Sequence, residues 1–299
     1  MPPLRHGDIM EAPKVLIGTR AYPAQGEARR RQANAQESLR RLRGVRLANI
    51  QFASREEWIE VEGFQNQALL KLDSRSVTGA SGILKPVAGE MFDCLAEVAR
   101  SERCEWFGFA NADIQLADSV VERVQSSSID AWIFAREDFD RATPDQFQMN
   151  LIGTDVFFVR TSAWSKVRRN FQNYIIGELA WDNVYAAQLL MLLNGRLCTE
   201  PSGVRHENHP TAWGTGVFAG FNGWLSVWDS DCFSRWCEYA WYLKHSGNEA
   251  SPASRLEMEQ RIFGRPLRLD QKVRSVLRRL WYGPRHPRWL RSVVQRASS

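Results

Sequence analysis

The ten residues 106–115, WFGFANADIQ, decide the fold that we expect of this 299-residue chain. Five mostly apolar residues, Trp106 to Ala110, run directly into the polar triplet Asn111-Ala112-Asp113. This pattern predicts a buried strand with a carboxylate at its carboxyl end. Ligands of open α/β sheets bind outside the carboxyl ends of strands, and a carboxylate there can hold a hard divalent cation that carries substrate phosphates. The alternative is that Asp113 caps the following helix, because Asp is a preferred N-cap residue.

The composition is that of a soluble globular protein with a proper core, at 44% hydrophobic and 24% charged residues. The sequence has no apolar run of about 18 residues and no apolar signal segment at its start. Its five cysteines are an odd number without CxxC spacing, which favours reduced thiols over disulfides or a zinc site. We therefore expect a cytoplasmic protein.

Positive charge is concentrated at the C-terminal end. Residues 255–299 contain twelve Lys or Arg and three acids, whereas the whole chain has a net charge of +5. Apolar residues recur at helical spacing between the arginines of residues 273–281, which predicts a basic amphipathic helix on an anionic membrane surface. Packing of this helix on the body is the alternative, and nucleic acid is the least favoured partner. We expect a leader at 1–13, one domain at 14–250 and a basic helical tail at 251–299.

Apolar runs and helical spacing alternate along the body. The runs predict strands at 15–20, 45–52, 106–110, 131–135 and 153–160. Helical spacing predicts helices at 29–43, from Pro86 to about residue 100, at 118–125 and at 184–193. The acidic segment 136–140 and the segment 206–210 are expected to be loops. Strands that alternate with helices predict an α/β fold with a mostly parallel central sheet, covered by helices on both faces.

Six short motifs follow one another in an order that resembles GT-A-type glycosyltransferases, in the nucleotide-diphospho-sugar transferase-like family. They are the turn Gly18-Thr19-Arg20 after the first strand, Lys85-Pro86 before a helix, the triplet 111–113, GxDxF at 153–157, WDN at 181–183 and HxxH at 206–209. The resemblance covers about residues 13–215. It implies a Rossmann-like GT-A fold and transfer of a sugar from a nucleotide-diphosphate donor to a polysaccharide or glycolipid acceptor, with Mn²⁺ or Mg²⁺.

The resemblance also implies roles for single residues in binding the donor. Asp113 matches the acid that coordinates the metal ion. His206 and His209 are candidates for a second metal ligand, and we expect only one of them to reach the site; the alternative is that both are exposed loop residues or pocket hydrogen-bonding groups. Asn111 stands where an Asp is more usual, and its expected partners are the ribose or metal-bound water. The remaining donor contacts are expected from Thr19 and Arg20, to base and ribose, and from Lys85, to the diphosphate.

Two carboxylates are candidates for the catalytic base that removes the proton of the acceptor hydroxyl. Asp182 matches the position at which GT-A enzymes often place this base, at the start of a helix. The alternative is a helix cap. Asp155, at the head of an apolar strand, is the rival, and its alternative is a structural ion pair with Arg136 or Arg160.

Two other functions are compatible with these patterns. A nucleotidyltransferase that forms sugar nucleotides would need a Gly-rich GxGTR-type loop after the first strand, of which only Gly18-Thr19-Arg20 is present. A catalytically silent protein that binds carbohydrate or nucleotide is the second alternative, and the Asn at position 111 gives it weight.

Overall fold

The computed structural model describes residues 15–210, 216–246 and 249–266, so the expected leader and the tail from residue 267 lie outside the described part. Its centre is one nine-stranded sheet in the order β3-β2-β1-β4-β7-β6-β9-β5, with β8 also paired to β6. The strands are β1 (Val15–Thr19), β2 (Val45–Phe52), β3 (Gln65–Leu70), β4 (Trp106–Ala110), β5 (Ile114–Leu116), β6 (Ala131–Phe139), β7 (Phe147–Arg160), β8 (Gly195–Cys198) and β9 (Val204–Glu207).

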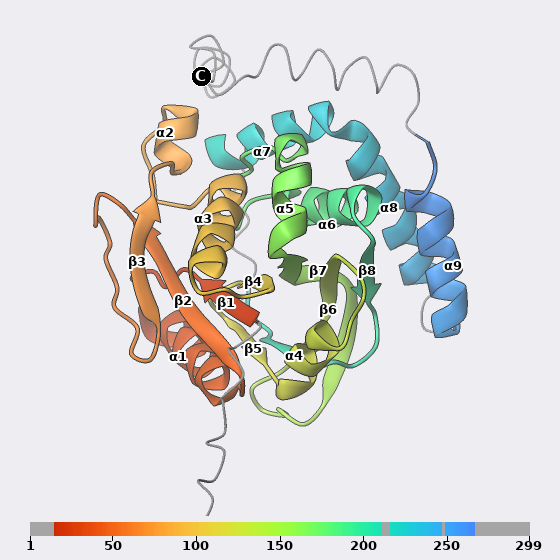
Figure 1. Ribbon diagram of the computed structural model, residues 1–299, viewed down its shortest axis with the longest axis horizontal. Coiled ribbons are helices and arrows are strands. Elements are labelled where there is room, and N and C mark those ends of the chain that lie inside the picture. Colours follow the sequence, from red (N-terminus) through yellow and green to blue (C-terminus); the bar gives the residue numbers. More distant parts are fainter. Residues whose placement is uncertain (1–14, 211–215, 247–248, 267–299) are drawn as a thin grey trace, which may run out of the picture.

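Helices cover both faces of the sheet (Figure 1). One face packs against α3, α5 and α6, and the other packs against α1 and α4. The helices are α1 (Gly26–Arg41), α2 (Ser74–Thr78), α3 (Ala88–Ser101), α4 (Asp118–Gln125), α5 (Thr161–Val167), α6 (Trp181–Leu192), α7 (Val217–Trp228), α8 (Ser230–Ser246) and α9 (Pro252–Phe263), with a 3₁₀ turn η1 at Arg168–Asn170.

Strand β4 shows why the deciding stretch is apolar without alternation. Phe107 and Phe109 enter the core beneath α3, while Trp106 and Ala110 enter the core on the opposite face. Successive side chains of a strand point to opposite faces, so a strand between two helical layers must be apolar at every position. The predicted buried strand at 106–110 is therefore confirmed, as are the strand at 45–52 and the helix at 118–125.

The sheet is mixed, and the expectation of a mostly parallel sheet is wrong. Strands β1 to β4 pair in parallel, but β7 is antiparallel to both β4 and β6, and β5 is antiparallel to β9. An apolar run that is buried on both faces does not show whether the strand is parallel or antiparallel to its neighbours. For this reason the sequence pattern gave the wrong prediction for β7. Strand β6 also continues to Phe139, so most of the acidic segment expected as a loop pairs with β7.

A close contact between β1 and α3 depends on glycine. A Cβ atom on Gly18 would lie 2.0 Å from Cδ2 of Leu95. Because Gly18 has no side chain, α3 packs directly on the middle of the sheet. The first strand thereby ends at a fixed position beside the end of β4.

The first part of the predicted tail, α9, packs on the body. Its residues Ile262 and Phe263 are buried, and Arg235 of α8 donates hydrogen bonds to the carbonyl oxygens of both, at 3.1 and 3.2 Å. Within the described residues, none of the helices has the length and apolar character needed to cross a membrane. The remaining domain boundaries stay predictions.

Candidate metal and substrate site

Asp113 lies in a tight turn between β4 and β5. The backbone N–H of Asn111 donates to the carbonyl oxygen of Asp155 at 3.1 Å, and the N–H of Ile114 donates to the carbonyl oxygen of Asn111 at 3.1 Å. The alternative role of Asp113 as a helix cap is wrong, because β5 follows directly and the N-cap of α4 is Ala117. The carboxylate is free to face the end of the sheet.

Strand pairing brings the two histidines to Asp113. His206 belongs to β9 and pairs with Ile114, the residue next to Asp113, in the antiparallel β5–β9 ladder. The expected loop at 206–210 is therefore partly a strand, and only the residues after Glu207 leave it. His209 follows two residues after the strand, so both histidines lie next to Asp113 where one was expected.

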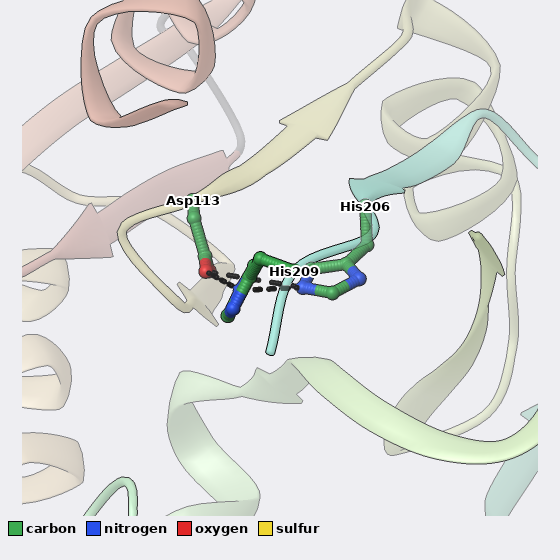
Figure 2. A group of neighbouring side chains, drawn as sticks. All are labelled: Asp113, His206 and His209. Atoms are coloured by element: carbon green, nitrogen blue, oxygen red, sulfur yellow. Dashed lines mark hydrogen bonds and ion pairs between the residues drawn. The ribbon is translucent and has the colours of Figure 1, made fainter. Parts of the chain in front are cut away.

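The three side chains form a compact cluster of possible metal ligands (Figure 2). Nε2 of His209 lies 3.2 Å from Oδ2 of Asp113 and 3.2 Å from Nε2 of His206, and the third separation, Nε2 of His206 to Oδ2 of Asp113, is 3.9 Å. Atoms bonded to one ion at about 2.0–2.2 Å lie roughly 3 to 3.5 Å apart. Two of the three separations lie in this range, and a small shift of His206 would bring the third into it, so one carboxylate oxygen and two imidazole nitrogens could hold a divalent cation.

The second nitrogen of each ring has a hydrogen-bond acceptor. Nδ1 of His206 lies 3.0 Å from Oδ1 of Asp138, and Nδ1 of His209 lies 3.0 Å from the carbonyl oxygen of Pro210. Each Nδ1 atom therefore has its own acceptor, which leaves Nε2 of each ring as the atom that would bind an ion. Without an ion, Nε2 of His209 donates to Asp113. Burial by itself raises the pKa of Asp113, but the hydrogen bond with His209 and the electrostatic influence of the two neighbouring histidines outweigh burial and lower it. The same hydrogen bond raises the pKa of His209.

Two cavities share Lys85, Asp113 and Gly177 in their walls, so Asp113 is the residue of the cluster that borders both. The first has a volume of about 450 Å³ and is lined mainly by residues that follow β1, β4 and α2, including Arg20 and Tyr22. The second has a volume of about 370 Å³ and is lined by both candidate bases, Asp155 and Asp182. Its lining also includes Arg136, Asn150, Trp181, His206 and His209. Both volumes are in the range of small-molecule sites.

Asp182 lines the second cavity from the first turn of α6. The alternative role as the helix cap is wrong, since Ala180 is the N-cap and α6 begins at Trp181. Burial, followed by the negative charge of Asp155, raises the pKa of Asp182 to about 7. Ala180 has a φ of 70°, a left-handed conformation that costs a non-glycine residue of the order of 1 kcal/mol. This strain lies directly beside the candidate base.

Both carboxylate oxygens of Asp155 accept hydrogen bonds from neighbouring side chains. Arg136 donates to its Oδ2, and the side-chain amide of Asn111 donates to its Oδ1. The alternative of a structural ion pair with Arg136 is confirmed, whereas Arg160 pairs with Glu105. Asn111 hence contacts Asp155, a partner other than the ribose or water that we expected.

Of the residues expected to bind the nucleotide-sugar donor, Arg20 and Lys85 line a cavity and Thr19 does not. Thr19 is buried and is not among the residues that line either cavity. Arg20 lines the first cavity and forms an ion pair with Glu57 at 2.9 Å, and burial lowers its pKa. Nζ of Lys85 lies 2.7 Å from Oε1 of Glu178.

Two residues of the site escaped the sequence analysis, Asp138 and Glu178. Asp138 was hidden because its segment was interpreted as a loop, although its acidic composition beside a buried strand was a usable signal. Glu178 precedes the WDN motif in an irregular segment, and no periodicity marks it.

Comparison with known proteins gives only distant similarities. No protein-family model matches the chain, and no curated protein is similar enough in sequence to count as a relative. Residues 1–349 of S. aureus TarS are similar in structure with a TM-score of 0.41 and 9% identity, over 88% of this chain and 78% of that one. The mannosyltransferase PcManGT from Pyrobaculum calidifontis, solved with GDP-Man and Mn²⁺, has a TM-score of 0.39 and 10% identity, over 96% and 80%.

A glycosyltransferase involved in glycosylation of the major capsid of PBCV-1 has a TM-score of 0.32 and 14% identity, over 84% of this chain and 99% of that one. At these TM-scores and identities, the similarities support no assignment of activity.

Proposed function

We propose that this protein is a divalent-metal-dependent glycosyltransferase that moves a sugar from a nucleotide-diphosphate donor to a saccharide or glycolipid acceptor. One observation carries the proposal: Asp113, which forms a cluster with His206 and His209, lines both of two cavities of substrate size. A transferase needs two substrate pockets that meet at the bond being transferred. A cation site at that junction suits the diphosphate.

Asp113, His206 and His209 would hold the cation. The mixed set of one carboxylate and two imidazoles favours Mn²⁺ over Mg²⁺, which prefers oxygen ligands. The bound ion would neutralise the charge that develops on the leaving diphosphate. Lys85 lines both cavities, so its ammonium group is placed to contact the same phosphates.

The larger cavity suits the nucleotide. Tyr22 and Phe109 offer apolar and aromatic surface to a flat base, while Arg20 and Glu57 offer a donor and an acceptor. A pocket with mostly apolar walls and a few placed polar groups is typical of a ligand site. Its contact with Asp113 would leave the diphosphate at the cation.

The smaller cavity suits the acceptor. Asp182 would accept the proton of the attacking hydroxyl, and a pKa of about 7 makes a carboxylate a stronger base while it stays ionised in part at neutral pH. Asp155 is the weaker candidate because Arg136 and Asn111 already occupy its two oxygens. Exposed aliphatic side chains of Ile152 and Leu179 in the lining favour an acceptor with an apolar part, such as a glycolipid.

Asn111 no longer favours a silent protein. Its amide donates to the carboxylate of Asp155, and an Asp at position 111 would place two carboxylates against each other. The amide at this position therefore has a structural reason that is independent of lost activity. No feature of the site specifically favours a nucleotidyltransferase.

Titration calorimetry with UDP, GDP, CMP and dTDP, each with and without Mn²⁺, tests the proposal. We expect one nucleotide to bind, and to bind more tightly with Mn²⁺. Asp113→Ala should abolish the Mn²⁺-dependent gain, whereas Asp145→Ala, an exposed acid in the turn between β6 and β7, should retain it. Binding of none of the four nucleotides would overturn the transferase proposal.

A further inference from the structure

Asp138 lies directly behind one of the two histidines of the cluster. In the parallel ladder between β6 and β9, Asp138 pairs with His206, so their side chains leave the sheet on the same face. Oδ1 of Asp138 lies 3.0 Å from Nδ1 of His206, on the side of the ring that faces away from Asp113. Both side chains are largely buried, at 16% and 9% exposure.

The carboxylate of Asp138 is itself held in place. Nε of Arg136 forms an ion pair with Oδ1 at 2.8 Å, and the side-chain amide of Asn150 donates to Oδ2 at 2.9 Å. Both oxygens of Asp138 therefore face fixed donors, one of them the guanidinium of Arg136, so the carboxylate is held as an acceptor.

An ionised carboxylate has no proton to donate, so the hydrogen bond requires the proton to be on Nδ1 of His206. The lone pair of Nε2 then points at Asp113 and His209, where a cation would bind. A carboxylate behind a ligating histidine fixes both the tautomer and the orientation of the ring.

We propose that Asp138 is a positioning residue for cation binding: it holds His206 with Nε2 unprotonated and directed at the site formed with Asp113 and His209. This inference rests on the divalent cation of the proposed function. Arg136 contacts Asp138 and Asp155 together, so one side chain links the histidine support to the acceptor cavity.

Calorimetric titration of the full chain with Mn²⁺ alone, without nucleotide, tests the inference. Asp138→Asn should weaken Mn²⁺ binding about 10- to 100-fold, as is usual when the support of a metal ligand is lost. Asp145→Asn makes the same chemical change at an exposed acid and should leave the affinity unchanged. In a His206→Ala background, Asp138→Asn should cause no further loss, because its effect passes through His206.

Wild-type affinity in Asp138→Asn, or an equal loss in the His206→Ala background, would overturn the inference and leave the proposed function intact. A wild-type chain that binds no Mn²⁺ would overturn both. Nitrogen-15 NMR of the metal-free wild type gives an independent reading that does not depend on folding of a variant. We expect a protonated Nδ1 and a bare Nε2 at His206, and the reverse tautomer would contradict the role of Asp138.

Discussion

Two carboxylates of the smaller cavity differ because of their immediate partners. Arg136 and Asn111 satisfy Asp155, whereas Asp182 is partly buried near that negative charge and has its pKa raised to about 7. A carboxylate whose pKa is raised toward neutrality is the better proton acceptor. At the scale of single residues, the site therefore favours Asp182 as the base.

Asp182→Asn should lower kcat by about 10²- to 10⁴-fold, the usual contribution of a general base, and should leave nucleotide binding intact. In the wild type, kcat should rise with pH and level off above about pH 7, because only the ionised carboxylate accepts a proton. Glu60→Gln, at an exposed acid before β3, is the control. A wild-type rate in Asp182→Asn would transfer the role to Asp155.

The same burial should affect the free energy of unfolding. The carboxyl group of Asp182 is held near pKa 7 in the folded state but has an ordinary value of 3.8. Its ionisation therefore opposes folding, an effect absent below pH 3.8 and complete above pH 7. The stability gain of Asp182→Asn over wild type should grow by about 2–3 kcal/mol from pH 5 to pH 8, as measured by urea denaturation. A constant difference would contradict the raised pKa.

At the scale of elements, what the sequence predicts depends on how many faces of each element are buried. The apolar runs at 45–52 and 106–110 are enclosed on both faces, and their positions were predictable. The direction of β7 was not, because strand polarity comes from pairing and not from the run itself. Asp138 was lost for a related reason: the second half of β6 alternates buried and partly exposed residues, and its charges resemble a loop.

The antiparallel pair β6–β7 carries an irregularity that helps to shape the smaller cavity. Ala135 pairs with Thr154, but the next residue, Arg136, pairs with Asn150, so three residues of β7 are left over. Gly153 lies in this bulge, and its N–H donates to Oδ1 of Asn150 at 2.9 Å. Bulges often redirect side chains beside functional sites, and this one brings Asn150 and Asp155 into one cavity.

Gly153→Ala should disturb the site more than the fold. The added Cβ would lie 2.8 Å from Nε of Arg136 and 3.0 Å from Cγ of Asn150, so Arg136 must move away from its two carboxylates. We expect kcat to fall about tenfold or more, with a loss of about 1–2 kcal/mol in the free energy of unfolding. Gly223→Ala, in open space on α7, is the matched control and should retain the rate. Wild-type turnover in Gly153→Ala would show that Arg136 does not depend on this bulge.

At the scale of the whole molecule, the two cavities meet because strands from different parts of the chain end together. The ends of β1 and β4 line one cavity, while β7, β9 and the start of α6 line the other. Their shared lining is Asp113, in the turn between β4 and β5, together with Lys85 and Gly177. Under the proposed function, donor and acceptor would occupy two cavities that both reach this carboxylate.

The prediction that the basic tail binds a membrane can be tested by a truncation that leaves the folded domain intact. Because α9 packs on α8 through Ile262 and Phe263, the truncation should begin at residue 267. Residues 267–299 still contain nine Lys or Arg and one acid, and each basic residue near an anionic surface contributes about 1 kcal/mol. We expect the full chain to float with anionic vesicles at low salt, and the truncated chain to remain in the dense fraction while it binds nucleotide normally.

Arg278→Glu with Arg279→Glu should reduce flotation without any deletion, and neutral vesicles serve as the control. Equal flotation of the full and truncated chains would contradict the predicted role of the tail in membrane binding. A soluble saccharide would then be the favoured acceptor.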